Sequence, residues 1–269
     1  MGVSEQTQLI QKDMKTKQIL IALALCLSIP LMAQTAEEIN EKSSDVIELS
    51  TMEMVATLKI IDAKGNTRER QITTASRKFG DVNKLLIKFI APADVKGTAL
   101  LVYDYENQSD NMWVYMPALR KVRRIVSNEK GKNFMGSEFT NADMSNPNKG
   151  DFTYELEGSE TVNGKECWKL GITPKNNALK SENGYSKRVA YIDKGNYFTY
   201  RVDYFDLAGK LQRIQTIDQY KKQSNGKYFA FYMEMKNVQN NRLSTLTVDK
   251  IQADSKLPES RFAPTALDK

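Results

Sequence analysis

The sequence predicts a mainly β protein whose antiparallel strands are joined by hairpins. From Met52 onward, apolar and polar residues alternate with a period of two, as side chains on the two faces of a strand do. Turn residues interrupt this alternation at intervals of about 8 to 12 residues, which is typical of successive hairpins. The sequence has no α/β alternation, internal repeat, heptad pattern or low-complexity tract, so we expect neither an α/β nor a coiled-coil fold.

The first residues have the layout of a secretory signal peptide. Lys15 and Lys17 precede an apolar run that extends to Leu31 and is followed by Ala33. The run is too short for a permanent anchor, because a spanning helix needs roughly 20 residues. We therefore expect residues 1–33 to be an N-terminal extension and signal peptide, and residues 34–269 to form a single exported β domain. Cys26 is an unfavourable lipidation site, because the large residue Leu25 precedes it.

Two segments have a helical pattern. Residues 35–49 carry apolar side chains on a polar background, and Glu37 lies where a negative charge favours a helix start. A short second helix is predicted over residues 137–144, where Thr140 and Asp143 have the spacing of a weak capping box.

Roughly a dozen strands are predicted. The first, residues 54–60, has an apolar residue at every second position and is followed by the turn sequence DAKGN. The others span residues 84–90, 96–103, 112–116, 120–125, 151–160, 166–173, 188–193, 198–204, 211–220, 229–235 and 243–251.

The composition excludes several kinds of catalytic site. The chain has no histidine, which removes Ser-His-Asp and Cys-His nucleophiles and imidazole metal ligands. Cys167 is the only cysteine beyond the signal peptide and lies in an apolar strand, so we interpret it as a buried small residue. No phosphate-binding glycine loop is present, and we expect no cofactor. A hydrolase built on two carboxylates is the least favoured alternative, because most acidic residues occupy turns and outward positions.

The net charge of +6 is spread over a chain with 27% charged residues of both signs. Nucleic acid is a poor partner for an exported protein. The positive excess would meet anionic head groups, acidic partner surfaces or no specific partner.

Three segments of the chain are unusual. They read FIAPADVKGTALLVYD from Phe89 to Asp104, MWVYMPALRKVRRI from Met112 to Ile125, and FMGSEF from Phe134 to Phe139. In their order and spacing, these segments together resemble the LolA-like family of outer-membrane lipoprotein-sorting proteins. The similarity extends from about Met52 to the sequence PESRF near the C-terminus. After FMGSEF the family pattern has an aromatic residue, an acidic residue and leucine. This chain has instead the five residues Thr140, Asn141, Ala142, Asp143 and Met144.

The resemblance implies a curved, unclosed antiparallel β-barrel whose concave face is covered by a few helices. A hydrophobic cavity between the two layers would hold the acyl chains of lipids or lipoproteins. The protein would then be a periplasmic carrier or sensor whose partners include an inner-membrane transporter or an outer-membrane acceptor. The alternative is a module that docks on an envelope assembly or a lipid-exporting membrane pump without carrying cargo.

The candidate lipid-binding residues lie in two of these segments. In residues 112–116 both faces of the strand are apolar, although an exposed antiparallel strand is usually polar on one face. Either the strand is central, with a helix on one side and ordinary core on the other, or one face lines a lipid cavity. Residues 134–139 could form a lid over the cavity or attach a short helix to the sheet. The candidates are Met112, Trp113, Val114, Tyr115, Met116, Phe134, Met135 and Phe139.

Arg120, Lys121, Arg123 and Arg124 form the densest basic cluster. Strand alternation would place Arg120 and Arg124 on one face, and Lys121 and Arg123 on the other. Arginines that share a face can hold a phosphate or a partner's carboxylate through two hydrogen bonds. Alternatively, the cluster is a solvated edge strand whose charges discourage pairing with other chains.

Overall fold

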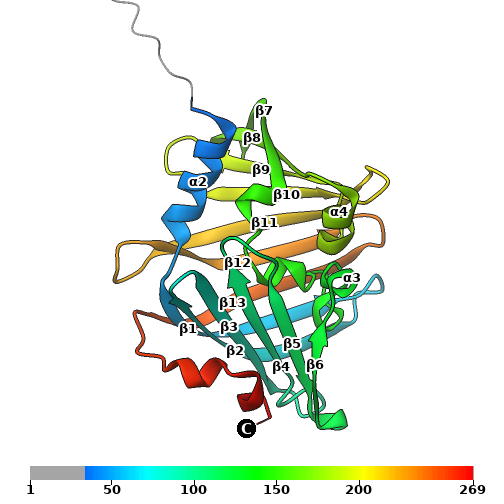
Figure 1. Ribbon diagram of the computed structural model, residues 1–269. Helices are drawn as coiled ribbons and strands as arrows, with labels where there is room; N and C mark the ends of the chain where they lie inside the picture. The colour runs from blue at the N-terminus through cyan, green and yellow to red at the C-terminus, as the bar shows by residue number, and fades with distance from the viewer. Residues whose placement is uncertain (1–33, 269) are drawn as a thin grey trace, which may run out of the picture. The chain divides into compact units, whose positions relative to one another are not determined.

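The computed structural model describes residues 34–268, of which residues from Ala36 onward form one compact unit. The expected signal peptide and Cys26 lie outside the described residues. The compact unit is built on one antiparallel sheet (Figure 1). Its strands are β1 (Thr51–Ile61), β2 (Thr67–Phe79), β3 (Val82–Ala91), β4 (Ala99–Tyr105), β5 (Asn111–Met116), β6 (Lys121–Ile125), β7 (Phe152–Val162), β8 (Lys165–Pro174), β9 (Lys187–Asp193), β10 (Thr199–Phe205), β11 (Leu211–Lys222), β12 (Tyr228–Asn237) and β13 (Arg242–Ala253).

The sheet is unclosed, with β6 at one edge and β7 at the other. The strands follow the order β6-β5-β4-β3-β2-β1-β13-β12-β11-β10-β9-β8-β7, so the first and last strands of the chain pair in the middle of the sheet. The mainly β, antiparallel prediction is confirmed. The sequence analysis missed β2, because the positions that face the core include Arg68, Arg70 and Thr74 and therefore hide the apolar alternation.

Side chains from β5 and β8 belong to the same buried apolar cluster, although these strands lie near opposite edges of the sheet. Figure 1 shows that the sheet is curved, and we call the face that carries this cluster the concave face. A second apolar cluster lies on the opposite face of β2 to β5, beneath the C-terminal residues 255–268. This C-terminal segment contains two short helical turns, η5 (Glu259–Phe262) and η6 (Pro264–Ala266), drawn in red in Figure 1.

The first predicted helix is confirmed as α2 (Ala36–Ile47), and its Ile39 is fully buried in the concave-face cluster. Two short helices were not predicted, α3 (Ser127–Lys130) and α4 (Asn177–Asn183), which lie side by side in Figure 1. None of the helices in the described residues is long and apolar enough to cross a bilayer.

The predicted helix over residues 137–144 is wrong. The chain forms two 3-10 turns instead, η2 (Phe134–Gly136) and η3 (Ala142–Met144), separated by extended backbone. The expected capping pair is nevertheless present: the Thr140 N–H donates to Asp143 Oδ2 (2.7 Å), and the Asp143 N–H donates to Thr140 Oγ1 (3.2 Å). No longer helix forms because the residues between the turns bind the sheet through their own polar groups.

Candidate functional site

The concave face combines buried apolar side chains with half-buried ones. Ile217, Met233 and Leu246 come from neighbouring strands β11, β12 and β13, pack against the concave-face cluster and keep part of their surface exposed. Met233 lies directly opposite Leu246, which lies opposite the buried Leu58 of β1. The middle of the curved sheet thus presents a continuous apolar surface that the covering elements leave partly open.

The candidate residues of β5 divide between the two faces of the sheet. Met112 and Val114 are buried in the concave-face cluster, and Met116 packs against it. Trp113 and Tyr115 pack instead against the second cluster, under the C-terminal segment. Both faces of this strand are therefore apolar because both are covered. Trp113 and Tyr115 do not reach the concave face.

Residues 134–139 attach a loop to the concave face. Phe134 and Phe139 are buried in the cluster, and the Phe134 ring lies 5.8 Å from that of Phe89. Met135 is half-buried and has a left-handed backbone, with φ of 49°. The structure thus brings these three side chains together with Met112, Val114 and Met116.

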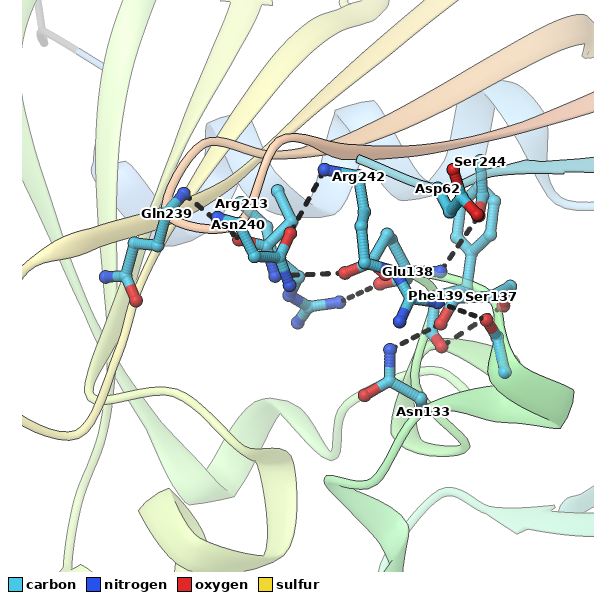
Figure 2. A network of polar contacts seen from close by, with 12 residues as sticks. Asp62, Asn133, Ser137, Glu138, Phe139, Arg213, Gln239, Asn240, Arg242 and Ser244 are labelled. Carbon is cyan, nitrogen blue, oxygen red and sulfur yellow. Dashed lines mark hydrogen bonds and ion pairs between the residues drawn. The ribbon is translucent and has the colours of Figure 1, made fainter. Parts of the chain in front are cut away.

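Glu138 fastens this loop to β12 and β13. Its side chain is almost completely buried, with Oε1 2.7 Å from Arg242 Nε, and Oε2 accepts a hydrogen bond from Asn237 Nδ2 (2.9 Å). The Glu138 N–H donates to Ser244 Oγ (2.9 Å), as Figure 2 shows. Because a buried carboxylate is costly without partners, these contacts determine where the loop lies.

Arg213 of β11 makes a second attachment. It is 3% exposed, and its Nη1 donates to the backbone carbonyl of Glu138 (3.0 Å) and to Asp143 Oδ2 (2.8 Å). Arg242 Nη2 donates to the Gly136 carbonyl (2.8 Å), and Arg70 of β2 donates to the Met135 carbonyl. Several arginines, rather than one, therefore hold the loop.

Sequence reasoning missed these polar residues as a group. A signal was available, because Arg188 and Arg213 interrupt apolar alternation at positions that face the core. Asp143, part of the departure from the family pattern after FMGSEF, takes part in the same network.

The basic cluster lies at the sheet edge. The prediction that Arg120 lies in a strand is wrong. Arg120 has a left-handed backbone, with φ of 48°, and ends the turn η1 (Pro117–Leu119), so that β6 begins at Lys121. The predicted shared face of Arg120 and Arg124 is therefore wrong. Arg123 lies 2.7 Å from Glu129 Oε2, and Arg124 donates to Asn111. The edge position agrees with the solvated-edge interpretation.

Burial raises the pKa of Asp104 and of Cys167. Desolvation and the charge of Asp110 raise the pKa of Asp104 to about 6, although the N–H and side-chain amide of Asn146 donate to it (3.1 and 2.9 Å). Burial also raises the pKa of the Cys167 thiol, which is completely buried, so the interpretation of Cys167 as a core residue is confirmed.

Solved structures with this fold are known. A domain provisionally assigned as an outer membrane lipoprotein-sorting protein from Vibrio parahaemolyticus is 28% identical, with a TM-score of 0.81 over 87% of this chain and 98% of that domain. A DUF1329 family protein from Desulfovibrio piger is 29% identical, with a TM-score of 0.80 over 86% and 97% of the two chains. A LolA superfamily protein from Nitrosomonas europaea, 18% identical, shares the fold with a TM-score of 0.69 over 86% and 98%. No curated protein matches the chain.

The curved, unclosed sheet and these solved structures show that the chain has a LolA-like fold. A family model described as "Uncharacterized protein" matches residues 81–269, and the chain belongs to that family.

Proposed function

We propose that the protein binds acyl chains of lipids or lipoproteins on its concave face and carries them through the periplasm. The observation that supports this function is the half-buried apolar surface of β11, β12 and β13, where Ile217, Met233 and Leu246 pack against the concave-face cluster and stay partly exposed. The similarity to lipoprotein-sorting proteins supports the same function. Export and outer-membrane lipoprotein sorting are parts of this proposal.

The energetics suit a carrier. Each buried methylene contributes about 0.8 kcal/mol, so a chain of ten methylenes gains on the order of 8 kcal/mol before the cost of ordering is subtracted. The adaptable side chains of Met112, Met116 and Met233 suit chains of different shapes. In this proposal Phe134, Met135 and Phe139 cover the bound chain, whereas Trp113 and Tyr115 contribute only to the fold.

A docking role at the sheet edge is the second candidate. Edge strand β6 carries Lys121, Arg123 and Arg124, and the neighbouring Leu119 is 63% exposed. Such an edge could contact an acidic membrane partner, either a transporter or an acceptor, with or without bound cargo.

A pair of matched substitutions tests the carrier function. Leu246→Gln places a polar group on the concave face, whereas Thr247→Gln makes a similar change at the next residue, which is exposed on the opposite face. We expect Leu246→Gln to weaken binding of dodecanol by about tenfold, because one apolar contact surface is lost, and Thr247→Gln to leave it unchanged. Calorimetry measures both affinities.

Native mass spectrometry of the wild-type protein mixed with bacterial lipid extract gives an independent measurement. We expect a bound acyl ligand in the wild type and less in Leu246→Gln. If the wild type retains no acyl compound and does not bind dodecanol, the carrier function is wrong. Crosslinking to a membrane partner that persists in Leu246→Gln would then favour docking.

A further inference from the structure

Three arginines lie in one row across the concave face. The row contains five residues, each directly opposite the next on the neighbouring strand: Arg188 of β9, Tyr204 of β10, Arg213 of β11, Asn237 of β12 and Arg242 of β13. Directly opposed side chains in an antiparallel sheet are close neighbours, with Cβ atoms about 5 Å apart. Arg188 shares its face with Ala190 and Ile192 of the concave-face cluster, so one end of this row adjoins the apolar surface.

Two of the three arginines have a carboxylate partner. Glu138 pairs with Arg242, and Asp143 pairs with Arg213. Arg188 forms no ion pair within the part of the chain that the structure describes. Its polar surroundings are the hydroxyls of Tyr204, Tyr185 and Tyr154. The row therefore contains one more positive charge than its partners neutralise.

Hydrogen-bond donors at the same end of the row lack acceptors. The Nε of Arg188, the hydroxyl of Tyr185 and the Nη2 of Arg213 are buried and have no hydrogen-bond partner among residues 34–268. The Tyr185 ring lies 5.4 Å from that of Tyr204, which is directly opposite both Arg188 and Arg213 in the row. Burial raises the pKa of the Tyr185 hydroxyl, so the hydroxyl keeps its proton. Buried donors are rarely left unpaired in native proteins, and these three would all be satisfied by an anionic acceptor.

We propose that Arg188, Tyr185 and Arg213 bind the anionic head group of an amphiphile, a carboxylate or a phosphate, whose chain lies on the adjoining apolar surface. The inference rests on the proposed acyl-binding function and specifies its ligand. A planar guanidinium can bind either anion through two parallel hydrogen bonds. Arg188 keeps part of its surface exposed although its Nε is buried, which leaves a route for the head group.

The test compares ligands that share a chain and differ in the head group. Dodecanoate, dodecyl phosphate and dodecanol are titrated at pH 8 into the wild type and into Arg188→Gln, Tyr185→Phe and Lys169→Gln. Inorganic phosphate is titrated into the wild type as a head group without a chain. Lys169 lies on β8, next to β9, but on the opposite face of the sheet. Lys169→Gln removes one positive charge, as Arg188→Gln does, but removes it away from the proposed site. Thermal unfolding of each variant shows whether it is folded.

We expect the wild type to prefer the two anions to dodecanol. Arg188→Gln should weaken binding of both anions about tenfold or more, because a charge-assisted pair is lost, and should leave dodecanol binding within about twofold. Tyr185→Phe should cause a smaller loss for the anions only, and Lys169→Gln should cause none. If Arg188→Gln does not fold, Arg188→Lys and Tyr185→Phe are compared with the wild type instead. Each removes hydrogen bonds to the head group without altering the positive charge at this site, so each should weaken binding of the anions and leave dodecanol binding unchanged.

Three results overturn the inference. One is equal binding of dodecanoate and dodecanol by the wild type, and another is an equal loss of both ligands in Arg188→Gln. The third is binding of inorganic phosphate alone as tightly as dodecyl phosphate, which would mean a free anion rather than a head group. If the wild type binds none of the three dodecyl ligands, the acyl-binding function itself fails.

Discussion

Asp104 ends the apolar part of β4, is 7% exposed and lies near the acidic residues Asp110 and Glu106. Because its pKa in the folded protein is about 6, above the usual value of 3.8, ionisation opposes folding. The contribution of protonated Asp104 to the free energy of unfolding is complete below about pH 4 and is lost as the pH rises through 6. Asp104 therefore makes the folded protein less stable at neutral pH than at mildly acidic pH.

Replacing Asp104 with asparagine should remove this dependence. We expect the stability of Asp104→Asn relative to the wild type to increase by up to roughly 3 kcal/mol between pH 4 and pH 7. Urea unfolding at four pH values measures the difference. Asp81→Asn, which removes an exposed carboxylate, controls for net charge. Parallel curves for the wild type and Asp104→Asn would contradict this assignment.

Some residues of the candidate site could be predicted from the sequence, and others could not. Met112, Val114, Phe134 and Phe139 were identified as candidates from their apolar types and lie in one cluster. Arg188 was not identified, because a charged residue in a strand usually faces solvent. Its inward position follows from its alternation with Ala190 and Ile192 in β9, which the sequence analysis did not use.

At the scale of elements, α3 and α4 meet through two glycines that follow them. A Cβ added to Gly131 would lie 2.7 Å from the Cα of Gly184, a separation that folded backbones do not tolerate. Beside this contact, the buried Lys130 forms an ion pair with Glu182. The loop after β6 is thereby joined to the loop after β8, so that the two ends of the open sheet are connected on one side.

Gly131→Ala should disrupt this contact. We expect it to lower the free energy of unfolding by about 2 kcal/mol, because the two backbones must separate. Gly150→Ala is the matched control, since its added methyl group meets no atom within 4 Å. Urea unfolding monitored by tryptophan fluorescence measures both. Equal stabilities of the two variants would mean that the helices can move apart at little cost.

At the scale of the whole molecule, the C-terminal segment covers the convex face of the first half of the sheet. Phe262 is fully buried there, with its ring 5.7 Å from that of Phe79, and its carbonyl accepts a hydrogen bond from the Tyr103 hydroxyl (2.7 Å). Trp113 and Tyr115 pack against the same cluster. The two faces of β5 are thus buried by different parts of the chain.

Phe262→Ala should destabilise the protein by about 3 kcal/mol, because it leaves a cavity beneath the segment. Leu207→Ala removes an apolar side chain that is 61% exposed and should change stability by no more than about 0.5 kcal/mol. Chemical unfolding compares the two, and dye binding to the uncovered face should increase only in Phe262→Ala. A small effect of Phe262→Ala would mean that the segment is not needed to cover this face.

By itself, the sequence determined much of the local structure: every strand except β2, the turns between the predicted strands, the first helix and the alternation of apolar residues between the two faces of a strand. These follow from a side-chain period of two and from turn chemistry, which act over a few residues. Only the tertiary structure decided that residues 255–268 cover Trp113 and Tyr115, and that Arg188, Arg213 and Arg242 form one row. Those arrangements depend on the register between strands that are distant in the chain, and the alternation within any one strand contains no information about that register.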